Sequence, residues 1–71
     1  MTPTVRLAND VAAQFHAGPP AEGAAAVANH IRMFWDPRMR AQLLAHVAAG
    51  GAELDPLAVA AAELLRGGPG R

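Results

Sequence analysis

The chain has 71 residues, no net charge at pH 7 and 52% hydrophobic residues. This is the length of one small domain, and its hydrophobic content is too high for a disordered tail. Without a basic field to gather a polyanion, we expect no nucleic-acid partner. No stretch approaches the roughly 18 apolar residues of a membrane span, and the first residues lack the order of a signal peptide. We therefore expect no membrane partner and a cytoplasmic location.

The residue types that are missing restrict the chemistry of the chain. It contains no Cys, Ser, Lys or Tyr, and its hydroxyl groups are those of Thr2 and Thr4 near the N-terminus. Without cysteine there is no disulfide framework and no thiolate ligand for a metal or cluster. Nearly every nucleophile used in covalent catalysis is absent as well. We expect a protein that is not an enzyme and has no catalytic residues.

Three histidines raise the question of a metal site. His16, His30 and His46 are not spaced three or four residues from one another, and a zinc site needs at least three ligands in a defined geometry. His16 and His46 fall where we expect the last turns of helices, and a cation complements the helix dipole there. We interpret the histidines as capping or surface residues and predict no metal site.

The first half of the chain predicts two helices. The first runs from about Pro3 to His16, with Thr2 as its cap and Pro3 in its first turn. Gly18-Pro19-Pro20 ends it, and the second helix runs from about Ala21 to Phe34. Apolar residues recur at helical spacing in both, at Leu7, Val11 and Phe15 in the first and at Ala24, Val27, Ile31 and Phe34 in the second.

The second half repeats one starting signal. Asp36-Pro37 and Asp55-Pro56 each combine a strong capping residue with a proline at the first helical position. The third helix ends at Gly50-Gly51. The apolar positions are Met39, Leu43, Leu44 and Val47 in the third helix and Leu57, Ala61, Leu64 and Leu65 in the fourth. The prediction is an all-α bundle of about four short helices, one domain over residues 1–66 with a disordered tail at 67–71.

Large side chains gather where the second and third helices meet. The chain's one Trp, one of its two Phe and two of its three Met lie between Met33 and Met39, together with arginines. Interface centres favour this combination. Our hypothesis is a partner interface that contains Met33, Phe34, Trp35, Arg38, Met39 and Arg40. Two alternatives are a core tryptophan with solvated arginines around it and a helix-turn-helix DNA-binding regulator, which the zero net charge and the absence of Lys and Ser disfavour.

The same stretch carries a family resemblance. The matching motifs, in order, are Arg6-Leu7-Ala8-Asn9, Val27-Ala28-Asn29-His30, Phe34-Trp35-Asp36-Pro37-Arg38-Met39-Arg40, Leu44, His46, Gly50-Gly51 and Leu54-Asp55-Pro56. Together they resemble the delta subunit of NAD-dependent formate dehydrogenase over about residues 5–65. The Phe34–Arg40 stretch, followed at a fixed distance by Gly50-Gly51 and Leu54-Asp55-Pro56, is the most specific part.

The resemblance implies a non-catalytic accessory subunit of a molybdoenzyme that oxidises formate and reduces NAD. In that family a large alpha subunit carries molybdenum bis-pterin guanine dinucleotide and iron–sulfur clusters, while beta and gamma subunits carry FMN, further clusters and the NAD site. The delta subunit binds no cofactor and supports an active, assembled complex. We expect this chain to dock on the alpha subunit through Trp35, Arg38 and Arg40. The alternative is a transient assembly or cofactor-insertion factor.

Overall fold

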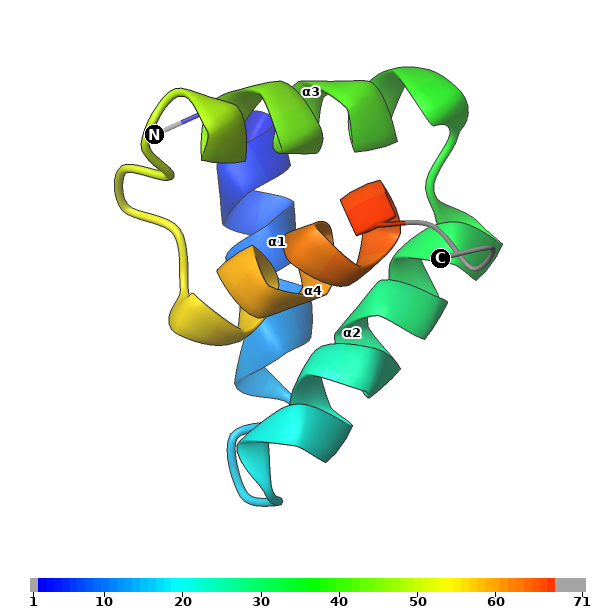
Figure 1. Ribbon diagram of the computed structural model, residues 1–71, viewed down its shortest axis with the longest axis vertical. Helices are drawn as coiled ribbons and strands as arrows, with labels where there is room; N and C mark the ends of the chain where they lie inside the picture. The colour runs from blue at the N-terminus through cyan, green and yellow to red at the C-terminus, as the bar shows by residue number, and fades with distance from the viewer. Residues whose placement is uncertain (1, 68–71) are drawn as a thin grey trace.

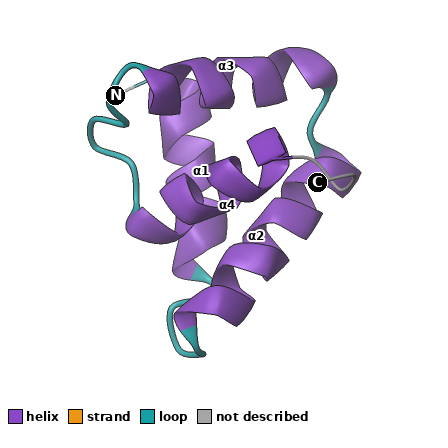
Figure 2. Ribbon diagram, viewed as in Figure 1, coloured by secondary structure: helices purple, strands orange, loops and turns teal. Residues whose placement is uncertain are grey.

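Four helices make up the part of the chain that the computed structural model describes, residues 2–67. They are α1 (Pro3–Ala13), α2 (Pro20–Phe34), α3 (Pro37–Ala48) and α4 (Pro56–Gly67), and these residues form no strand (Figures 1 and 2). The all-α prediction is confirmed. None of the helices described is long and apolar enough to cross a membrane. Gly67 belongs to α4, and the rest of the predicted tail, 68–71, lies outside the described residues.

Each helix begins with a proline, whose missing N–H costs nothing in the first turn. Side-chain oxygens in front of three of the helices accept the free N–H groups of that turn. The Thr2 hydroxyl accepts from the N–H of Val5. The Asp36 carboxylate caps α3 at the N–H of Met39 over 2.8 Å. The carboxylate of Asp55 accepts the N–H of Leu57, the second residue of α4, also over 2.8 Å.

The core lies where α2 packs against α4, with α1 and α3 closing it from the other sides (Figure 1). Its largest fully buried side chains are few, namely Val5, Val27, Ile31 and Leu43. Alanines fill most of the remaining positions, including Ala8, Ala12, Ala28, Ala58, Ala61 and Ala62. Small side chains let helix backbones approach closely, so the core is thin. It depends on close contact between helices rather than on many large apolar side chains.

Three leucine and phenylalanine positions that the sequence pattern assigns to the core are instead exposed. Leu7 is 44% exposed, Phe34 70% and Leu64 46%. The buried residues of α4 are alanines, and those of α1 are Thr4, Val5, Ala8, Val11 and Ala12. Both buried faces are therefore rotated away from the stripe that the larger residues suggest. The first helix also ends at Ala13, three residues before His16, where a tight turn replaces it.

Candidate interface at the corner between α2 and α3

The corner between α2 and α3 is a two-residue link. Trp35 and Asp36 are both extended, with φ −95° and −77°, and Pro37 opens α3 directly behind them. Proline disfavours the helical conformation for the residue before it, so α2 cannot continue through Asp36. The link joins the upper end of α2 to the start of α3, which runs back across the top of the molecule (Figure 1). The sequence therefore fixes a sharp corner at this place.

Trp35 anchors the corner in the core. Trp35 is only 8% exposed and belongs to the core cluster, and its backbone N–H donates to the carbonyl of Ile31. Met39 is half-buried and packs against the same cluster. In the isolated chain Trp35 is therefore buried, as in the interpretation of a core tryptophan, and its contact with a partner stays a prediction.

Arg40 is also used within the chain. Its guanidinium donates to the carbonyls of Trp35 at 3.2 Å and Arg32 at 3.4 Å. These carbonyls lie at the C-terminal end of α2, where the helix leaves acceptors free and the dipole favours a cation. Arg40, which is half-buried, thus ties the start of α3 to the end of α2.

Three members of the hypothetical interface point to solvent: Met33, Phe34 and Arg38. We call these residues the corner patch. Met33 is 66% exposed, and the ring of Phe34 lies against His30 with 4.8 Å between ring centroids. Within residues 2–67, Met33 and Phe34 are the most exposed of the large hydrophobic side chains. The corner patch is the part of the predicted interface that a partner can reach.

The arginines at the corner differ in their electrostatic setting. In the described part of the chain the ion pairs are His16–Asp55 and Glu63–Arg66, so Arg38 has no carboxylate partner there. Arg38 lies in the first turn of α3, at the positive end of the helix dipole. A cation at that end is unfavourable by about 0.3–1 kcal/mol. Arg32 and Arg40 lie against the negative end of α2, where their charge is favourable.

A second cluster of polar side chains holds the loop between α3 and α4. The amide of Asn9 donates to the carbonyl of Glu53 at 2.9 Å and accepts the N–H of Asp55 at 2.7 Å. His16 donates to the carboxylate of Asp55, and His46 donates to the carbonyl of Ala52, both over 2.7 Å. Glu53 has a positive φ of 64°, which this bonding fixes. No local sequence pattern predicts this role of Asn9, and the one signal for it is its place in the family motif Arg6-Leu7-Ala8-Asn9.

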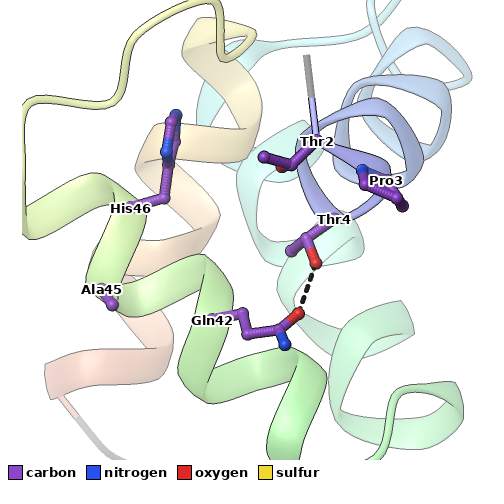
Figure 3. A pocket seen from close by; sticks show the side chains of 6 residues that line it. All are labelled: Thr2, Pro3, Thr4, Gln42, Ala45 and His46. Carbon is purple, nitrogen blue, oxygen red and sulfur yellow. Dashed lines mark hydrogen bonds between the residues drawn. The ribbon is translucent and has the colours of Figure 1, made fainter.

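The first turn of α1 and the middle of α3 border an open groove of about 580 Å³ (Figure 3). The Thr4 hydroxyl donates to the amide oxygen of Gln42 at 2.7 Å on one side of it, and His46 lies farther along α3. Among residues 2–67 no group of His, Asp and Glu side chains is placed to hold a metal ion. The groove thus offers polar contacts between helices and no reactive group beyond an imidazole.

Comparison with known proteins assigns the chain to a family. The family model described as "NADH-dependant formate dehydrogenase delta subunit FdsD" matches residues 4–62. The chain belongs to the FdsD family. The match takes in α1, α2, α3 and the first half of α4, so it includes the corner patch and the polar cluster around Asn9. As a delta subunit of formate dehydrogenase, an FdsD protein has partner subunits. No curated protein and no solved structure matches the chain.

Proposed function

We propose that this chain is a non-catalytic subunit that docks on the large alpha subunit of formate dehydrogenase and supports its assembly or stability. The observation that carries the proposal is the FdsD match over residues 4–62. The composition supports it, because a chain without Cys, Ser, Lys and Tyr offers neither thiolates for iron–sulfur clusters nor the usual nucleophiles. In this proposal the partner subunits hold the molybdenum cofactor, the clusters, FMN and the NAD site.

Docking would act through binding energy alone. A ligand that binds only the folded form of its partner stabilises that form by mass action, by about 2.7 kcal/mol at a hundredfold excess over Kd. A small rigid helical surface is sufficient for this role. The exposed apolar residues at the corner support the proposal, since large hydrophobic side chains in water gain free energy when a partner covers them.

The experiment is to produce the alpha, beta and gamma subunits of formate dehydrogenase with and without this chain. We expect the tagged chain to be recovered in stoichiometric amount with the complex. Its omission should lower both the yield of complex and formate-dependent NAD reduction, while the chain alone shows no activity. Recovery only with cofactor-free alpha subunit would instead support the transient assembly factor. An unchanged complex without the chain, together with no recovery of any subunit, would overturn the proposal.

A further inference from the structure

We infer that the corner patch, Met33, Phe34 and Arg38, is the surface that contacts a partner subunit, and that the facing surface of that subunit is an apolar recess bordered by carboxylates. The inference rests on the proposed function for the existence of a partner. It goes further by naming the face of this chain and the chemistry of the surface opposite.

The apolar half of the patch follows from its exposure. Met33 and Phe34 are neighbours at the end of α2, and each leaves about two thirds of its surface in water. By its spacing Phe34 continues the stripe of Val27 and Ile31, but it is the last residue of α2, where its side chain is exposed and its ring lies beside His30. The two other exposed large residues, Leu7 and Leu64, stand singly on α1 and α4 and are less exposed. Among residues 2–67, the end of α2 is the one place where two exposed large apolar side chains are neighbours in the sequence.

The carboxylates of the partner follow from Arg38. This cation stands at the positive end of α3 without an ion pair among residues 2–67, so the fold alone gives no reason for an arginine there. Local conflicts of this kind occur at functional sites. The carboxylate of Asp36, two residues before Arg38 in the sequence, already accepts the N–H of Met39. A carboxylate of the partner would give Arg38 the planar bidentate contact that guanidinium favours.

A second copy of the chain is a poorer occupant than a different subunit. A two-fold contact through the patch would place the Arg38 side chains of both copies on one small surface, where like charges repel. With Asp36 occupied as a helix cap, the patch itself supplies no counter-charge. Electrostatic complementarity therefore favours a different, acidic surface.

The test uses the full chain, tagged and produced with the partner subunits, and compares two pairs of variants. Phe34→Gln and Arg38→Glu change the corner patch. Leu7→Gln and Arg6→Glu are matched controls, because both residues are exposed on α1 and the Arg6 side chain has no described hydrogen bond. We expect each patch variant to lower recovery of the partner subunits about tenfold or more, as truncation of an interface centre does. The controls should recover them as wild type does.

Thermal unfolding of each isolated variant separates docking from folding. We expect the Tm of Arg38→Glu to equal or exceed that of wild type, since an acidic residue suits the first turn of a helix. Folded patch variants that still recover the partner fully would overturn the inference and leave the proposed function standing. Failure of wild type to recover any partner would refute the proposed function itself. A dimer of the isolated chain that Phe34→Gln dissociates would assign the patch to a second copy and so overturn the inference.

Discussion

At the scale of single residues, the side chain of Asn9 makes two long-range polar contacts. One amide group joins α1 to two backbone positions more than forty residues away, at Glu53 and Asp55. Asn9→Ala would leave the part-buried N–H of Asp55 without its acceptor. We expect a loss of about 1–3 kcal/mol in the free energy of unfolding, measured by denaturant titration of the isolated chain. Gln14→Ala is the control, because Gln14 is exposed, and its stability should stay within about 0.5 kcal/mol of wild type.

Two neighbouring aromatic residues give a second test at this scale. Trp35 lies in the core and Phe34 lies in solvent, although both belong to the same corner. Trp35→Ala should lower the free energy of unfolding by about 3–5 kcal/mol, which is a large part of the stability of a small domain. We therefore expect this variant to be largely unfolded. Phe34→Ala should leave the helical circular dichroism spectrum unchanged. A folded Trp35→Ala variant of wild-type stability would contradict the assignment of Trp35 to the core.

At the scale of elements, the contact of α2 with α4 depends on Gly23. A Cβ atom added there would meet the carbonyl oxygen of Phe15 at 3.0 Å and the side chain of Leu57 at 3.2 Å. Alanine gains about 1 kcal/mol of helix propensity over glycine, but overpacking costs about 1–3 kcal/mol. We expect Gly23→Ala to lower the Tm. Gly18→Ala is the control, since nothing lies within 4 Å of its added Cβ, and its Tm should stay equal or rise.

The helix starts could be predicted because their signals are local. A capping oxygen, a proline and the free N–H groups of one turn lie within four residues, as at Asp36 and Asp55. The stop after α3 is local too: Gly50, at φ 123°, and Gly51, at φ 66°, return their N–H groups to the last turn.

The buried faces and the polar cluster could not be predicted in the same way. The alanines of these helices occupy both buried and exposed positions, so the pattern of larger residues misplaced Leu7, Phe34 and Leu64. The contacts of Asn9 and His16 join residues about forty positions apart, and no local spacing reveals them. Burial also depends on contacts with distant residues. The sequence therefore predicts a candidate site at the corner but does not show that Trp35 is buried and Phe34 exposed.

At the scale of the whole molecule, the core has few large side chains, so we expect the stability of the fold to be sensitive to small core substitutions and to increase when a partner binds. Ile31 is one of the four largest fully buried side chains among residues 2–67, so the loss of one methylene group there should lower the stability of the whole fold. A substitution of Ile by Val in a core typically lowers the free energy of unfolding by about 0.5–1.5 kcal/mol. In a domain of this size, each kcal/mol lowers the Tm by about 4–8 °C. We therefore expect the isolated Ile31→Val variant to melt several degrees below wild type.

The same variant in the presence of partner subunits tests whether docking supports the fold. Ile31 is a fully buried residue of α2 and lies outside the corner patch, so the folded variant should present an unchanged docking surface. Because binding selects the folded form, recovery of the partner subunits by Ile31→Val should remain near that of wild type, in contrast to Phe34→Gln. Hydrogen exchange of α2 should be slower in the complex than in the isolated variant. Equal losses of recovery in Ile31→Val and Phe34→Gln would show that general stability, rather than the corner patch, governs the association.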